Sequence, residues 1–280
     1  MGGIGGTGGK GGTGGAEDAG RSDAAADAAG GAGGALSQDG SAGGIGNDSG
    51  SDGGTAKCAA LYVMLDKTGS MTIEGDTATK WQTAITALNT FVNDPQSGNI
   101  YMALQYFSTD NYANDCTGAV YTTPEVPMGR LPDNAGAISA SLSATIPNGF
   151  TPTEPALRGA IEFCKVFQQD TVNNPDKMKC VAVLVTDGEP NVCATDPATL
   201  VRIAADGYNN DGVMTFTVGM YGADITLLDQ IAQAGNGDCT PDPTDTTWAC
   251  NVSAGGTTVI DALNTIRGSV ATLNFAACGK

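Results

Sequence analysis

The sequence predicts a three-layer α/β fold, in which a mostly parallel central sheet is flanked by helices on both faces. Two mostly apolar runs, 59–65 and 180–186, have the length of buried strands, and the aspartates Asp66 and Asp187 follow them directly. Between and after these runs, apolar residues recur at the spacing of amphipathic helices. Strands that alternate with helices in this way are typical of a parallel sheet covered on both sides.

The first half of the predicted domain contains strands at 59–65 and 100–107. Between them, apolar residues from Trp81 to Val92 mark a helix that ends near Asp94 and Pro95. Segment 119–128 is more polar and contains two prolines, which predicts one antiparallel strand at an edge of the sheet. A weak helical pattern follows at 133–145.

The second half opens with a stronger helix, in which apolar residues recur from Ala156 to Phe167 and Pro155 occupies the first turn. After the strand at 180–186, the pattern predicts further strands and helices. They are a helix at 200–205, a strand at 213–218, a helix at 225–234, a short strand at 248–252 and a last helix at 259–273.

Composition divides the chain into two parts. Residues 1–56 hold 22 of the 41 glycines and no proline, and their other residues are mostly Ala, Asp and Ser. Such a segment buries too little apolar surface to offset its chain entropy, so we expect a disordered tether at 1–56 and one globular domain at 57–280. A collagen triple helix is not expected, because it requires abundant proline.

The chain is strongly acidic, with a formal net charge of −17, of which −12 belongs to residues 57–280. This charge disfavours nucleic acid and anionic membrane surfaces as partners, and it favours divalent cations and basic or neutral partners. No apolar run approaches the roughly 18 residues of a membrane span.

Eight scattered cysteines and no histidine point to disulfides rather than to a zinc or redox site, because no Cys-x-x-Cys pair is present. Four disulfides would place the protein outside the cytoplasm, and eight buried free thiols are the alternative. We expect Cys239 to pair with Cys250 across a turn-rich insertion, and Cys58 to pair with Cys278 at the two ends of the domain. No signal peptide is visible after Met1, which leaves a longer gene product or unconventional export.

Oxygen-bearing side chains gather where the predicted strands end. Asp66, Thr68 and Ser70 follow the first strand, Thr151 precedes a helix, and Asp187 follows the second buried strand. The carboxyl ends of parallel strands meet at one edge of the sheet, where ligands bind in such folds. Hard oxygen donors from three loops are what Mg²⁺ requires. Glu189 either shapes the choice of ligand or is a solvated surface residue, and the aromatic residues Tyr106, Phe107 and Tyr112 are interpreted as core and loop packing rather than as a binding site.

The Asp66-x-Thr68-x-Ser70 motif resembles the metal-ion-dependent adhesion site of von Willebrand factor type A domains. Thr151 and Asp187 match that family's loop threonine and second aspartate, and the resemblance covers about 58–273. Thr68 departs from the family's serine: its hydroxyl is kept, but a methyl group restricts its rotamers. The resemblance implies a site for Mg²⁺, or Mn²⁺ or Ca²⁺, that binds an acidic side chain of a protein ligand.

Three functions follow from these observations. The first is a secreted or surface-attached module for metal-dependent adhesion or protein binding, and not an enzyme. The second is a metal-assisted hydrolase, which the absence of histidine and of a Gly-x-Ser-x-Gly motif disfavours. The third is a structural domain stabilised by disulfides, whose aspartates only cap helices and accept hydrogen bonds from loop amides.

Overall fold

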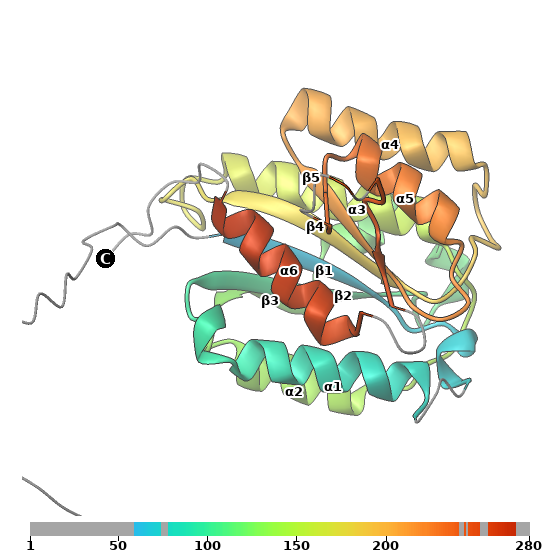
Figure 1. The fold of residues 1–280 in the computed structure, drawn as a ribbon, viewed down its shortest axis with the longest axis horizontal. Helices are drawn as coiled ribbons and strands as arrows, with labels where there is room; N and C mark the ends of the chain where they lie inside the picture. Colours follow the sequence, from blue (N-terminus) through green and yellow to red (C-terminus); the bar gives the residue numbers. More distant parts are fainter. Residues whose placement is uncertain (1–58, 74–77, 241–243, 245, 253–256, 273–280) are drawn as a thin grey trace, which may run out of the picture. The chain divides into compact units, whose positions relative to one another are not determined.

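A computed structural model describes residues 59–73, 78–240, 244, 246–252 and 257–272 (Figure 1). The predicted tether at 1–56 lies outside these residues. In the described ranges, one six-stranded sheet has the order β3-β2-β1-β4-β5-β6. The strands are β1 (Ala59–Asp66), β2 (Ile100–Phe107), β3 (Val126–Arg130), β4 (Lys179–Thr186), β5 (Met214–Gly219) and β6 (Cys250–Asn251). Only β3 pairs antiparallel with its neighbour, which confirms the predicted fold class.

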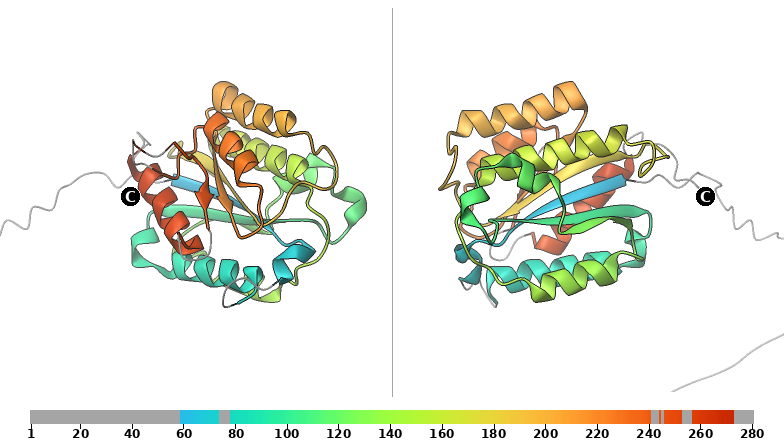
Figure 2. Two further views of the ribbon diagram at one scale, coloured as in Figure 1. Left: turned by 45° about the vertical axis from the view of Figure 1, so that its right-hand side comes forward. Right: turned by 180° about the vertical axis from the view of Figure 1, so that it is seen from behind.

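Two layers of helices cover the sheet, with α1, α2 and α6 on one face and α3, α4 and α5 on the other (Figures 1 and 2). The helices are α1 (Lys80–Asn93), α2 (Ala135–Ala144), α3 (Thr153–Gln169), α4 (Pro197–Asp211), α5 (Ile225–Ala234) and α6 (Val259–Thr272). Each begins or ends close to the position that the apolar pattern predicts. In the described ranges, no helix has both the length and the apolar character needed to cross a membrane.

The core follows from the alternation of side chains along fully buried strands. All eight residues of β1 are buried. Leu61, Val63 and Leu65 contact the side of α1, α2 and α6, whereas Tyr62 and Met64 contact the side of α3, α4 and α5. A central strand buried on both faces reads as a continuous apolar run, so the sequence pattern of β1 could be recognised without the structure.

Local capping explains where the helices start. Thr79 accepts a hydrogen bond from the backbone N–H of Gln82 at the start of α1. Asp196 caps α4 in the same way, with Pro197 in the first turn, and Gly212 ends that helix with a left-handed φ of 65°. These are preferred residues for helix starts and ends.

The edge of the sheet differs from the prediction for 119–128. Residues Gly118–Thr122 form a 3-10 helix, and the strand is shorter and starts only at Val126. Tyr121 explains the difference, because its side chain is fully buried and packs in the core on the side of α3. The antiparallel edge strand itself is present, and Pro127 lies in it.

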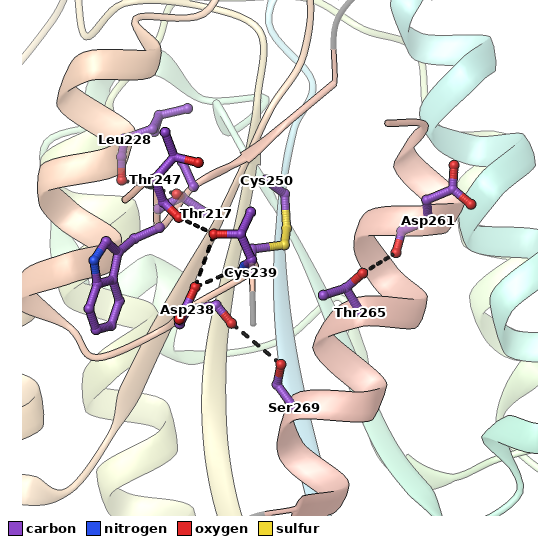
Figure 3. Close-up of a disulfide and its surroundings, with 12 residues drawn as sticks. Thr217, Leu228, Asp238, Cys239, Thr247, Cys250, Asp261, Thr265 and Ser269 are labelled. Carbon is purple, nitrogen blue, oxygen red and sulfur yellow. Dashed lines mark hydrogen bonds between the residues drawn. A yellow bond between two sulfur atoms is a disulfide. The ribbon is translucent and has the colours of Figure 1, made fainter. Parts of the chain in front are cut away.

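All cysteines in the described ranges form disulfides. The predicted Cys239–Cys250 bridge is confirmed and joins the chain after α5 to β6 (Figure 3). The other two bridges are Cys116–Cys193 and Cys164–Cys180. The predicted pairing of Cys58 with Cys278 lies outside the described residues.

Candidate functional site

The two aspartates meet at the point where the sheet topology changes direction. Strands β1 and β4 are parallel neighbours at the centre of the sheet, and the chain proceeds from them toward opposite edges. Asp66 ends β1, and Asp187 directly follows β4. The structure therefore brings together two carboxylates from positions 121 apart in the sequence, at the edge where ligands bind in this class of fold.

The loop after β1 directs its hydroxyl groups toward the second aspartate. The backbone N–H of Thr68 donates to Asp66 Oδ1 over 2.7 Å, which fixes the turn. Thr68 Oγ1 lies 3.0 Å from Ser70 Oγ, and Ser70 Oγ donates to Asp187 Oδ1 over 2.8 Å. The threonine at position 68 thus keeps its hydroxyl in the network, and its side chain is almost fully buried.

Backbone hydrogen bonds join the loop before α3 to the loop after β1. Gly69 N donates to Gly149 O over 3.2 Å, and Asn148 N donates to Lys67 O over 2.6 Å. Gly149 has a φ of 106°, and a Cβ atom there would lie 2.3 Å from Ser108 Oγ. Only glycine tolerates both this φ and this close contact. Gly149 therefore lets the loop before α3 approach the loop after β1 and carry Thr151 to the site.

Thr151 and Ser70 face the same small space beside Gly188. A Cβ atom added to Gly188 would lie 3.4 Å from Thr151 Oγ1 and 3.7 Å from Ser70 Oγ. The five predicted residues therefore lie around one position: Asp66, Thr68, Ser70, Thr151 and Asp187. Two residues beyond Thr151, the buried hydroxyl of Thr153 has no hydrogen-bond partner within the described part of the chain.

Burial raises the pKa of Asp66, the first aspartate of the site. Asp66 is fully buried, and desolvation, followed by the nearby charge of Asp187, raises the pKa of its carboxyl group to about 7. Hydrogen bonds from Thr186 and Thr68 oppose this rise. A positive ion beside the two carboxylates would favour the ionised form of Asp66 instead.

This raised pKa predicts how stability depends on pH without metal. The folded protein holds the Asp66 proton more tightly than the unfolded chain does. This difference stabilises the fold in full below about pH 4, which is close to the ordinary pKa of an aspartate. That contribution is lost as the pH rises through about 7. In EDTA, the free energy of unfolding should therefore fall between pH 5 and pH 8, and this slope should be smaller in Asp66→Asn. Urea titrations across this range test it, and equal slopes in the two proteins would contradict it.

Sequence reasoning missed three residues that hold the site together. Thr186 Oγ1 donates to Asp66 Oδ2 over 2.6 Å, and Asn191 donates to Thr151 from its side chain while accepting from the Thr151 backbone N–H. Both belong to or follow the end of β4, where polar residues after an apolar run were a usable signal. Lys80 gave no such signal, because a lysine at the start of a helix is usually exposed.

Lys80 is instead buried, with its Nζ atom 2.6 Å from Asp187 Oδ2. The side chains of Lys80 and Asp187 are 7% and 0% exposed, respectively. Gly222, with a φ of 97°, leaves room for this pair, since its Cβ position lies 3.3 Å from Lys80 Nζ. With both aspartates ionised, the two carboxylates and this lysine give the site a formal charge of −1.

Lys80→Met should have opposite effects with and without a divalent ion. Removing the ammonium group removes repulsion of the ion, so calorimetry should show tighter Mg²⁺ binding. In EDTA, the same variant should be less stable than the wild type, because Asp187 loses its buried partner. Weaker or unchanged Mg²⁺ binding in a folded Lys80→Met protein would contradict this account of Lys80.

The aromatic residues near the site divide into two groups. Tyr106 and Phe107 are buried in the core, in agreement with the prediction. Tyr112 packs against another loop residue, also as predicted, but 43% of it is exposed. Its ring meets that of Phe150 edge to face, with centroids 6.0 Å apart, and Phe150 is 54% exposed.

The family model of the von Willebrand factor type A domain matches residues 60–249. The chain belongs to this family. The match runs from the second residue of β1 to the residue before β6, so it includes all five residues of the candidate site. No curated protein matches the chain.

Several solved structures are similar to this chain at low sequence identity. The manganese-loaded TRAP protein of Plasmodium vivax is 20% identical, with a TM-score of 0.50, and the match covers 81% of this chain and 80% of that chain. Proximal thread matrix protein 1 from the mussel byssus is 17% identical, with a TM-score of 0.49. The match covers 78% of this chain but only 48% of that one.

A third relative is the pilus adhesin SpaC from Lactobacillus rhamnosus GG, which is 18% identical with a TM-score of 0.49. Here the match covers 76% of this chain and 29% of that chain. This chain therefore spans less than half of the mussel and Lactobacillus structures. The likeness to the TRAP protein, with a TM-score of 0.50, supports the fold and no more.

Proposed function

We propose that this von Willebrand factor type A domain is a metal-dependent module for adhesion or protein binding. The observation that carries the proposal is the chain of contacts from Thr68 through Ser70 to Asp187, beside Thr151 and Asp66. A divalent ion held by these five side chains would bind an acidic residue of a protein partner and so complete its ligand shell.

The donor set suits such an ion. Two carboxylates and three hydroxyls are hard oxygen ligands, as Mg²⁺ and Mn²⁺ require, and Ca²⁺ also accepts them. The hydroxyls add no charge, so the carboxylates alone would neutralise the ion, and Lys80 would leave the loaded site with a formal charge of +1. A positive site of this kind favours an anionic ligand. When bound, the ion supplies an electrophilic position for that ligand.

A hydrolase is disfavoured by the chemistry of the residues present. The chain contains no histidine, and the hydroxyl of Ser70 donates to a carboxylate of the site. The carboxylates of Asp66 and Asp187 would be ligands of the ion, and the amine of Lys80 is paired with Asp187. A protonated amine in a buried ion pair cannot accept a proton, so binding is the better supported function.

We further propose that the module works outside the cytoplasm. The three disulfides Cys116–Cys193, Cys164–Cys180 and Cys239–Cys250 favour an oxidising compartment. Residues 1–56 would then act as a glycine-rich tether, with a root-mean-square reach of roughly 40 Å for a flexible chain of this length. Such reach suits a module that searches for a partner.

Affinity capture tests the function. The full chain is immobilised in Mg²⁺ and exposed to surface and secreted proteins of its own organism, and the column is then washed with EDTA. We expect the bound proteins to elute with EDTA and a parallel Thr151→Ala column to retain far less of them. Partners that stay bound through EDTA, or that Thr151→Ala captures equally well, would show that the metal does not mediate binding.

A further inference from the structure

We propose that the partner presents its acidic residue among apolar side chains, because apolar residues surround the candidate metal site. This inference rests on the proposed function. Eight large hydrophobic residues in the described ranges are well exposed, and five of them lie on loops or in a short 3-10 helix at the carboxyl-end edge of the sheet. We call these five the apolar collar: Ile73, Tyr112, Ile146, Phe150 and Tyr221.

Contacts of Tyr112, Phe150, Tyr221 and Ile73 connect the collar to the five site residues. Phe150 directly precedes Thr151 and meets Tyr112 edge to face. The ring centroid of Tyr221 lies 6.0 Å from Lys80 Nζ, which in turn pairs with Asp187. On a third side, Ile73 N donates to Ser70 O over 3.1 Å, and Ile73 O accepts from Lys80 N over 3.1 Å.

The fifth residue lines a hollow next to the site. A cavity of about 550 Å³ is bordered by Ile146, Lys67 and Asn148, among others. Lys67 lies between Asp66 and Thr68 in the sequence, and its carbonyl accepts from Asn148. Ile146 is 80% exposed at this hollow. The rest of the lining is mostly polar and includes Asp110 and Glu125, so Ile146 would offer an apolar contact at this hollow to a side chain next to the partner's carboxylate.

The exposure of the collar carries the inference. Large apolar side chains that gather on one exposed surface mark interaction sites, and tyrosine and phenylalanine are enriched in protein interfaces. Apolar contacts around a charged contact also exclude water, which strengthens the attraction between the ion and a carboxylate. A run of acidic and polar residues would leave the collar in water, whereas an acidic residue with apolar neighbours would cover it.

The charge of the site and of the chain restricts the classes of partner that can bind to the collar. Lys80 and the ion would leave the loaded site with a formal charge of +1, and nearby Lys67 is itself paired with Asp110, so a basic segment would be repelled by the ion and Lys80. The net charge of −17 also disfavours a second copy of this chain and an anionic membrane as occupants of the collar. The chemistry therefore points to a short protein segment with one Asp or Glu between apolar residues.

A displayed library of random nine-residue peptides tests this on the full chain in Mg²⁺, with EDTA elution. We expect the eluted peptides to share an Asp or Glu with Phe, Leu, Ile, Met or Tyr enriched beside it. An EDTA-eluted pool with acidic residues but no apolar enrichment would overturn this inference and leave the proposed function standing. A library without any EDTA-dependent, acidic peptides would overturn the proposed function itself.

Variants then locate the contact, with one selected peptide as the probe. Phe150→Ser and Tyr221→Ser should each weaken its binding at least about tenfold, the loss expected from removing a buried aromatic contact. Val172→Ser is the matched control, because Val172 is 83% exposed and lies between α3 and β4, outside the collar. Calorimetric Mg²⁺ affinity should stay unchanged in all three. Equal peptide binding by the collar variants and the wild type would overturn the inference.

Discussion

Asp66→Asn is expected to remove the stabilisation that Mg²⁺ gives to the domain, because it removes half of the anionic charge at the site. An ion that binds only the folded state stabilises it by about 2.7 kcal/mol at one hundred times its dissociation constant. For a domain of this size, that corresponds to a rise in Tm of roughly 5–10 °C. Thermal unfolding in Mg²⁺ and in EDTA measures the difference, which should vanish in the variant.

Asp187→Asn should abolish the same metal effect but should also destabilise the metal-free protein. Its carboxylate is the buried partner of the Lys80 ammonium group, and an uncompensated buried charge costs about 3 kcal/mol or more. Asp66→Asn has no such cost, because the neutral side chain resembles the protonated form that burial favours. Equal stability of the two variants in EDTA would contradict this distinction.

Loss of the Cys116–Cys193 disulfide should be the largest stability change among the described bridges. It closes a loop with a sequence separation of 77, and its removal should cost about 4.5 kcal/mol on a chain-entropy estimate. Cys193 follows Asn191, which holds Thr151, so the bridge also anchors the loop after β4. The double variant Cys116→Ser and Cys193→Ser should therefore bind Mg²⁺ more weakly as well.

The Cys164–Cys180 bridge is the control. Its sequence separation of 16 predicts a smaller loss of about 3 kcal/mol, and it joins α3 to the start of β4, at the end of that strand opposite Asp187. Its double serine variant should lose stability without losing Mg²⁺ affinity. Urea unfolding measures the stability of both double variants, and calorimetry measures their Mg²⁺ affinity. A similar loss of Mg²⁺ affinity in both would show that it follows from general destabilisation and not from the position of the Cys116–Cys193 bridge.

Much of the fold could be predicted because its strongest signals are local. The apolar runs of β1 and β4 and the helical spacing in α1 and α3 each follow from one stretch of sequence. The edge near β3 could not be predicted as well, since the 3-10 helix at Gly118–Thr122 depends on a tertiary contact of Tyr121. The sequence pattern shows that this segment is polar, but it does not show which residues the segment packs against.

The residues of the site likewise divide into those that local sequence signals predict and those whose roles depend on tertiary contacts. Asp66 and Asp187 could be placed because each ends a recognisable buried strand, and the motif resemblance supplied the hydroxyl residues. Lys80 could not, because its role depends on a contact with a residue 107 positions away. The exposed collar was missed for a related reason: whether Tyr112 is buried or exposed depends on how its loop folds against Phe150.

Crystals of the full chain soaked in Mn²⁺ test the central claim most directly, through an anomalous difference map. The account predicts one strong peak enclosed by Asp66, Thr68, Ser70, Thr151 and Asp187, and no peak there in crystals of Asp66→Asn. A map without a peak among these side chains, or with its strongest peak elsewhere on the domain, would contradict it.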